Sequence, residues 1–162
     1  MGQISEKTGV GVDKIENVIV WGNHSPTQYP DLHYAQVDGK PGREVYPDDE
    51  SYEKFITKVA QRGKEIIDAT GKSSSSSAAA AICEHMHDWW FGNEDGGYVS
   101  MGVIVDGGKY GVDGDLCFSY PCNCKDGEWE IVEGLELNEY SKAKIKSSEE
   151  ELLKERKVAL NR

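Results

Sequence analysis

The stretch Val18–Trp21 constrains the fold of this chain more than any other. Its four residues are apolar, and the first three are β-branched, a pattern typical of a strand that is buried on both sides. Gly22 follows at once, and Pro26 and Pro30 disfavour regular structure in the next segment. The sequence therefore predicts a buried strand that delivers His24 into an irregular loop.

Two helices are predicted in the first half of the chain. Residues 3–8 are followed by Gly9, and the position just after a helix end favours glycine. This helix would begin at the first residue without an N-cap, which suggests a preceding segment. The acidic residues 48–50 suit the start of a second helix that continues to about Ala69.

A serine tract at residues 73–77 leads into a third predicted helix. On composition alone these serines would suit a flexible linker. Four alanines and an apolar run follow them directly, however, which favours a helix over residues 74–90.

The hydrophobic pattern changes after residue 97. Residues 98–108, 116–124 and 128–135 are strand-like, and Asp126-Gly127 is a hairpin signal between the last two of these segments. A proline within the second of them, Pro121, indicates an edge strand or a strand end.

A closing helix is predicted after these strands. Ser148 and Glu151 have the spacing of a capping box, although the helix could already begin near Asn138. We find no internal repeat and no domain boundary. The order of elements predicts a single α+β domain over residues 1–162, with an antiparallel sheet packed against long helices.

Composition excludes several classes of partner. Across 162 residues, 18 Lys and Arg stand against 29 Asp and Glu, a formal net charge of −11. Such a surface repels phosphate backbones and anionic lipids, so neither nucleic acid nor a membrane is expected as a partner. The four cysteines do not form a secreted disulfide framework. Reduced thiols and the lack of a targeting segment favour a cytoplasmic location.

His24 is the leading catalytic candidate. A rigid strand followed by an abrupt loop is a way to hold a general acid or base, and an unperturbed imidazole titrates at about pH 6.5. An ordinary loop histidine bonded to the backbone is the alternative, because so short a motif also occurs by accident.

Neither a metal nor a dinucleotide site is predicted from motifs. Cys83 and His87 would share a helix face, but His85 would not, and no second cluster supplies further zinc ligands. The chain contains no glycine-rich dinucleotide fingerprint and no phosphate-binding loop motif.

Several stretches together resemble the C-terminal, substrate-binding domain of cytosolic-type malate dehydrogenases, in the lactate/malate dehydrogenase superfamily. They occur in the order of that family and cover most of the chain. The stretches are residues 17–35 ("NVIVWGNHSPTQYPDLHYA"), 55–63 ("FITKVAQRG"), 75–92 ("SSSAAAAICEHMHDWWFG"), 98–107 ("YVSMGVIVDG"), 110–121 ("YGVDGDLCFSYP") and 124–145 ("CKDGEWEIVEGLELNEYSKAKI").

This resemblance implies an oxidoreductase that transfers hydride between NAD and a 2-hydroxy or 2-oxo dicarboxylic acid, malate or oxaloacetate. His24 matches the family's catalytic histidine, which takes the hydroxyl proton of malate. Ser74, at the start of the small-residue helix, matches a serine that lines the substrate pocket. A homodimer is the assembly that the family implies.

The resemblance also implies that part of the enzyme lies outside this sequence. The family binds NAD mainly through an N-terminal dinucleotide-binding half, which this chain does not contain. The aspartate that orients the histidine and three substrate-binding arginines would precede Met1. We therefore expect the chain to be inactive alone. The alternative is a stand-alone, non-catalytic domain that acts as a dimerising or interaction module.

Overall fold

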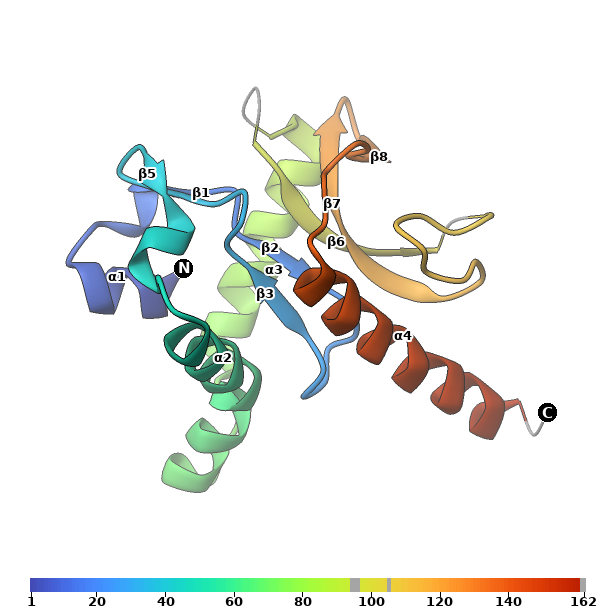
Figure 1. The fold of residues 1–162 in the computed structure, drawn as a ribbon, viewed down its shortest axis with the longest axis horizontal. Helices are drawn as coiled ribbons and strands as arrows, with labels where there is room; N and C mark the ends of the chain where they lie inside the picture. Colours follow the sequence, from blue (N-terminus) through green and yellow to red (C-terminus); the bar gives the residue numbers. More distant parts are fainter. Residues whose placement is uncertain (94–96, 105, 161–162) are drawn as a thin grey trace.

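Strand β2 (Ile19–Trp21) lies at the centre of the molecule in the computed structural model, which describes residues 1–93, 97–104 and 106–160 (Figure 1). Ile19 and Trp21 are buried, as a strand inside the core requires. Beyond the strand, Gly22 forms a bridge to Ser119, so the predicted buried strand is confirmed.

Strand β3 (Tyr29–Asp31) pairs antiparallel with β2, although the sequence predicted irregular structure through this segment. Val20 lies opposite Pro30 in the register. Among the described residues β3 pairs only with β2, so its other edge needs no donors and the missing N–H of a proline is tolerated there.

The largest sheet is formed by β6 (Val99–Ile104), β7 (Cys117–Lys125) and β8 (Glu128–Ile131) in the order β6-β7-β8. Both pairings are antiparallel. Asp126 and Gly127 connect the last two strands with φ of 54° and 82°, the left-handed conformations that a tight hairpin needs. The three predicted strands and their hairpin are confirmed.

The prediction for Pro121 was wrong, because it lies within the central strand β7, opposite Ser100 of β6. Its carbonyl accepts a hydrogen bond from Val132 N at 2.9 Å. The amide and carbonyl of one strand residue point toward the same neighbour, so the missing N–H faces the place where β8 ends.

A small N-terminal subassembly precedes this sheet. It contains α1 (Gly2–Thr8), two short 3₁₀ helices and a three-stranded sheet of β1 (Ile15–Glu16), β4 (Gln36–Val37) and β5 (Lys40–Pro41). Gly9 follows α1 with φ of 74°, which confirms the predicted helix end.

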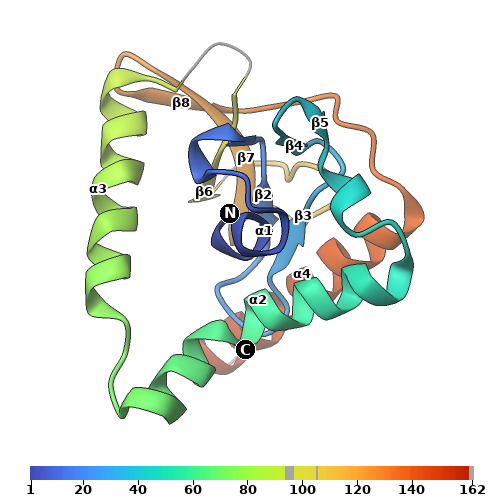
Figure 2. The same cartoon turned by 90° about the vertical axis from the view of Figure 1, so that its left-hand side faces the viewer.

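Helices α2 (Asp49–Thr70) and α3 (Ser75–Phe91) confirm the two central helix predictions. Asp48 caps α2 by accepting a hydrogen bond from Ser51 N at 2.8 Å. Figure 2 shows α3 along one side of the molecule, with the β7–β8 hairpin at one of its ends. At that end Trp89 Nε1 donates to Gly127 O at 2.7 Å.

Helix α4 runs over Glu139–Ala159 and begins ten residues earlier than a capping box at Ser148 would require. Its N-cap is Asn138, whose Oδ1 accepts a hydrogen bond from Ser141 N at 2.8 Å. The capping-box prediction was therefore wrong, whereas the predicted start near Asn138 is confirmed.

The core lies where β2, β3 and β7 meet α2 and α4 (Figure 1). Its largest fully buried aromatic side chains are Trp21, Tyr29, Tyr52, Phe118 and Tyr120. Helices and antiparallel strands share this core, so the α+β prediction is confirmed. In the part of the chain that the structure describes, no helix is both long and apolar enough to span a bilayer.

Candidate functional site

His24 projects from the loop that joins β2 to β3, and its side chain is exposed. The turns of the loop are closed by backbone bonds from Ser25 N to Asn23 O at 2.9 Å and from Gln28 N to Ser25 O at 3.1 Å. Among the described residues no hydrogen bond engages the imidazole, so both ring nitrogens can face a ligand. The structure thus holds the backbone of this loop while it leaves the ring accessible.

The loop starts at Gly22, which has a φ of +99°. A Cβ atom here would lie 2.8 Å from Ser148 Cβ and would overlap the Ser148 hydroxyl. That hydroxyl accepts a hydrogen bond from Asn23 N at 2.8 Å. Glycine is required because the backbone is left-handed and because α4 approaches closely.

A carboxylate of α4 lies beneath the loop. Glu151 Oε2 accepts hydrogen bonds from Asn23 Nδ2 at 3.3 Å, from Thr27 Oγ1 at 2.5 Å and from Ser25 Oγ. The capping-box pair of the sequence analysis, Ser148 and Glu151, thus contacts the His24 loop. Their three-residue spacing places them on one face of α4.

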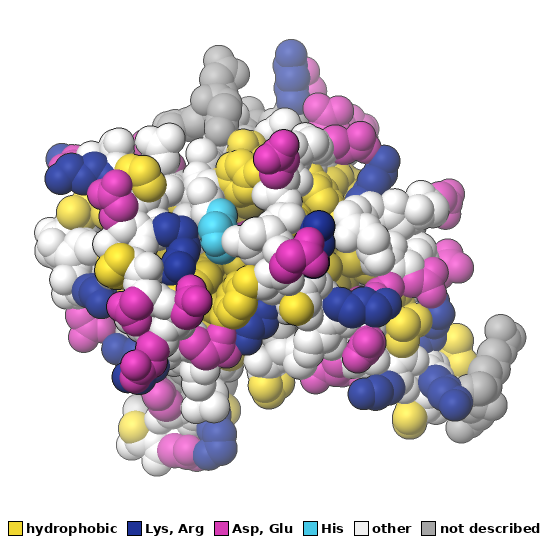
Figure 3. Space-filling view, in the orientation of Figure 1, with side chains coloured by type: hydrophobic (Ala, Val, Ile, Leu, Met, Phe, Trp, Pro, Cys, Tyr) yellow, Lys and Arg dark blue, Asp and Glu magenta, His cyan; other side chains and the backbone are white. Residues whose placement is uncertain are grey.

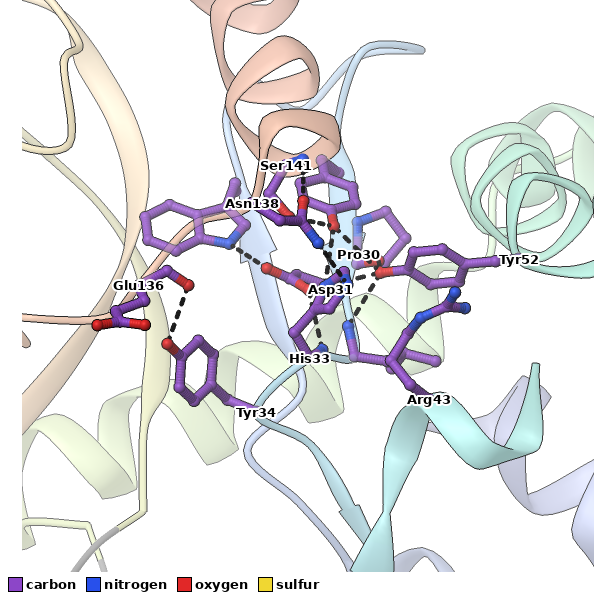
Figure 4. A network of polar contacts seen from close by, with 12 residues as sticks. Pro30, Asp31, His33, Tyr34, Arg43, Tyr52, Glu136, Asn138 and Ser141 are labelled. Carbon is purple, nitrogen blue, oxygen red and sulfur yellow. Dashed lines mark hydrogen bonds and ion pairs between the residues drawn. The ribbon is translucent and has the colours of Figure 1, made fainter. Parts of the chain in front are cut away.

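A second polar network lies behind β3 and is centred on Asp31 (Figure 4). This carboxylate is only 1% exposed, yet it accepts hydrogen bonds from Trp21 Nε1 at 3.1 Å and His33 N at 3.0 Å. His33 Nδ1 lies 2.6 Å from its Oδ1. Because a buried carboxylate needs such partners, the network ties β2 and the segment after β3 together.

Two buried phenols extend this network toward α2 and α4. Tyr29 OH lies 3.2 Å from Tyr52 OH and 3.0 Å from Ser141 Oγ. Burial, and then the charge of Asp31, raises the pKa of Tyr29 and of Tyr52 above the ordinary phenol value. Both phenols therefore stay protonated and serve as hydrogen-bond donors that fix the base of the loop.

Ser74 occupies the N-cap position of α3 and is partly buried. Its side chain does not cap the helix. Within the described ranges no hydrogen bond or ion pair joins Ser74 to His24 or to the loop around it. The structure therefore brings His24 and α4 together but does not connect the two predicted site residues directly.

The starts of helices α2 and α4 do not suit a pyrophosphate group. Asp48 and Asp49 stand at the start of α2 and Glu139 at the start of α4, and negative charge at a helix start repels phosphate. In the same part of the chain no group of three or more His, Cys, Asp or Glu side chains could hold a metal ion. All four cysteines are free.

The surface offers no simple electrostatic guide to a ligand. Figure 3 shows acidic and basic side chains interspersed over one face of the molecule, with hydrophobic side chains between them. Exposed ion pairs such as Lys64–Asp68 and Lys54–Glu50 occur on the surface, and pairs of this kind contribute little to stability.

A domain of this architecture, with a histidine loop between its two central strands, matches a known dehydrogenase domain. The sequence profile of the lactate/malate dehydrogenase, alpha/beta C-terminal domain family matches residues 2–162, and the chain belongs to that family. Among curated relatives, cytoplasmic malate dehydrogenase of Zea mays is 47% identical over 98% of this chain. The cytoplasmic malate dehydrogenase of Bos taurus is 48% identical over 97% of it.

Solved structures agree with this assignment. Malate dehydrogenase from Naegleria fowleri covers 99% of the chain with a TM-score of 0.89 and 40% identity. Trichomonas vaginalis lactate dehydrogenase in complex with NADH and oxamate covers 99% with a TM-score of 0.90 and 34% identity. The resemblance seen in the sequence is confirmed. The chain spans about half the length of the relatives, 49% of the Zea mays protein and 48% of the Bos taurus protein.

Sequence reasoning missed Asp31 and misassigned Glu151. Asp31 was missed because the sequence predicted irregular structure where β3 lies, and because its partner Trp21 is brought to it by the pairing of β2 with β3. Nothing local marks Glu151, because its partners lie 124 to 128 residues away in the sequence.

Proposed function

We propose that the chain is the substrate-binding half of an NAD-dependent malate dehydrogenase, with residues 1–162 forming one domain of that enzyme. Family membership and the malate dehydrogenase relatives support this assignment. The observation that carries it is the exposed His24 on a loop whose side chains on both sides of the histidine, Asn23 and Ser25, bind Glu151.

In this proposal His24 exchanges the proton of the reaction. A neutral imidazole takes the hydroxyl proton of malate while hydride leaves C2, and the imidazolium returns that proton to oxaloacetate in the reverse direction. Such proton transfer by a positioned side chain typically contributes about 10²–10⁴-fold to a rate. The held loop supports this role because a general base must stay within hydrogen-bond reach of the substrate hydroxyl.

Ser74 is proposed to bind the dicarboxylic acid. Its hydroxyl caps no backbone amide of α3 and makes no hydrogen bond within the described residues, so it is available to donate to a carboxylate or carbonyl oxygen. NAD is proposed to bind mainly to residues outside this chain, since the sequence contains no glycine-rich dinucleotide fingerprint. A cytoplasmic location is proposed from the names of the relatives.

The test supplies the half that the chain lacks. The N-terminal half of the Zea mays relative is fused ahead of Met1, and oxidation of NADH by oxaloacetate is followed by absorbance. We expect turnover from the fusion and none from the 162-residue chain alone. In the fusion, His24→Asn should lower kcat by about 10²–10⁴-fold.

The control is His87→Asn, an exposed histidine of α3, which should leave turnover unchanged. Thermal unfolding of each variant verifies that the fold is intact. Ordinary turnover by the chain alone, or by the His24→Asn fusion, would contradict the proposal.

One observation favours association as a second function. No residue of α3 is buried, and four of its large apolar side chains are 48–72% exposed, namely Ile82, Met86, Trp90 and Phe91. An apolar face of this kind marks an interaction surface. We propose that a second copy of the chain covers it, which would give the homodimer that the family resemblance implies.

A further inference from the structure

Three side chains on one face of α4 are directed at the His24 loop. They are Ser148, Glu151 and Glu155, spaced three and four residues apart, which places them one above another along the helix. Ser148 is 0% exposed, so this face is in direct contact with the loop. In Figure 1 the helix passes the end of the β2–β3 hairpin.

The hydrogen bonds of this face of α4 are made by residues directly before and after His24 in the sequence. Glu151 Oε2 accepts a hydrogen bond from Asn23 Nδ2, on one side of His24 in the sequence, and another from the Ser25 hydroxyl, on the other side. A third donor, Thr27 Oγ1, reaches the same oxygen at 2.5 Å. Three donors converge on one unprotonated oxygen, an arrangement that favours the ionised carboxylate because charge-assisted hydrogen bonds are the stronger ones.

Two further contacts complete the attachment. Asn23 Nδ2 also reaches Glu155 Oε1 at 3.1 Å. Ser148 Oγ accepts Asn23 N at 2.8 Å and lies 3.1 Å from Thr27 Oγ1. None of these bonds involves the His24 ring, so α4 acts on the histidine only through the backbone and side chains next to it.

We infer that Glu151 is a positioning residue, whose carboxylate fixes the loop so that the His24 imidazole is presented in one orientation. The inference rests on the proposed role of His24 and adds to it a residue from the far end of the chain. The competing explanation is that Glu151 only attaches α4 to the core. In that case its loss would weaken the whole molecule without loosening the loop selectively.

The test reads the loop directly, in the 162-residue chain, by NMR. Glu151→Gln keeps the shape of the side chain but replaces one oxygen by an NH₂ donor. We expect hydrogen exchange at the amides of Asn23, Ser25 and Thr27 to become at least about tenfold faster, with shifted His24 ring resonances. Exchange in β7 should stay unchanged.

Glu150→Gln is the matched control. It removes the same charge one residue earlier on α4, where the side chain is exposed. We expect this variant to keep the loop amides and the His24 resonances of the unsubstituted chain. The inference would be overturned if hydrogen exchange at the loop amides became equally faster in both variants, or if it stayed unchanged in Glu151→Gln.

The unsubstituted chain offers a second readout. Burial opposes ionisation of Glu151, but hydrogen bonds from Ser25, Thr27 and Asn23 outweigh it and hold its pKa below the ordinary value of 4.5. The carboxylate therefore holds the loop above that pKa, and the loop is released as pH falls through it. The loop resonances should show this transition below pH 4.5.

Other charged groups beside Glu151 on α4 are Lys154 and Glu155, and Glu155 shares the Asn23 amide with it. Glu155→Gln separates the contribution of that second carboxylate. The transition should vanish in Glu151→Gln and persist in Glu150→Gln. If Glu151→Gln does not fold, the pH titration decides, and a loop that stays unchanged until the whole chain unfolds in acid would overturn the inference.

These outcomes do not depend on catalysis. A firm loop in Glu151→Gln refutes the positioning role whatever His24 does. If the fusion enzyme instead turns over without His24, the proposed function fails, while the loosening of the loop remains measurable.

Discussion

Gly22, directly after strand β2, lies against Ser148 of helix α4. Two requirements make glycine necessary here, namely its positive φ and the closeness of the Ser148 side chain. The first requirement is local, because L-residues avoid this backbone region. The second is tertiary, because only the fold brings Ser148 to this point.

Gly22→Ala should separate these two requirements when it is compared with Gly39→Ala. Gly39 also has a positive φ, of 74°, but no atom lies within 4 Å of its would-be Cβ. We expect Gly39→Ala to lower the free energy of unfolding by about 1 kcal/mol and Gly22→Ala by clearly more. Urea denaturation measures the free energy of unfolding of both variants. Equal decreases would show that the contact with α4 places no further restriction on residue 22.

Only those parts of the candidate site that depend on adjacent residues in the sequence could be predicted. A strand pattern that stops at Gly22 was sufficient to place His24 on a loop. The roles of Glu151 and Asp31 depend on partners that the fold supplies, from α4 in one case and from Trp21 in the other. Spacing along the chain cannot reveal such contacts, so Ser148 and Glu151 were mistaken for a capping box.

At the scale of elements, helix α4 connects the two polar networks of the molecule. Its N-cap Asn138 lies beside the Asp31 network, with Nδ2 at 2.9 Å from His33 Nε2. Roughly three to four turns further on, Ser148 and Glu151 meet the His24 loop. The orientation of this one helix therefore sets the geometry at both ends of the β2–β3 hairpin.

Asn138→Ala should lower the free energy of unfolding by about 1–2 kcal/mol, since it removes an N-cap and the contact with His33. Asp48→Ala is the comparison, because Asp48 caps α2 through Ser51 N without a partner in the Asp31 network. Its loss should be smaller, about 1 kcal/mol. Chemical denaturation with a circular-dichroism readout checks the order, and a larger effect at Asp48 would contradict it.

Elements with strong local signals were predicted well. Asp126-Gly127 indicated its hairpin, and Gly9 its helix end. The failures were prolines inside strands. Pro30 and Pro121 are tolerated because each has its missing N–H at a free edge or at a strand end, and such freedom is a property of the assembled sheet.

At the scale of the whole molecule, the order of helices and strands could be predicted but the partner of α3 could not. An apolar run of this length is typical of a buried helix, yet every residue of α3 is at least partly exposed. A groove of about 600 Å³ runs between α3 and the segment that holds β1 and β2. The second copy proposed above would complete this burial.

Self-association of the chain should therefore depend on α3. We expect sedimentation equilibrium to show a monomer–dimer equilibrium, and Ile82→Gln with Met86→Gln to shift it to monomer, because the apolar contact area is lost. Ile104→Gln is the control, at a residue 63% exposed on β6, and should leave the equilibrium unchanged. An unaffected dimer in the double variant would exclude α3 as the contact.

The bond between Asn23 and Ser148 spans 125 residues of sequence, and this separation has a consequence for biosynthesis. Translation proceeds at about 5–20 residues per second, so Ser148 follows Asn23 from the ribosome by roughly 6–25 s. Throughout that interval the backbone amide of Asn23 lacks its acceptor on α4. On the inference above, the imidazole acquires its orientation among the late events of folding, when α4 docks.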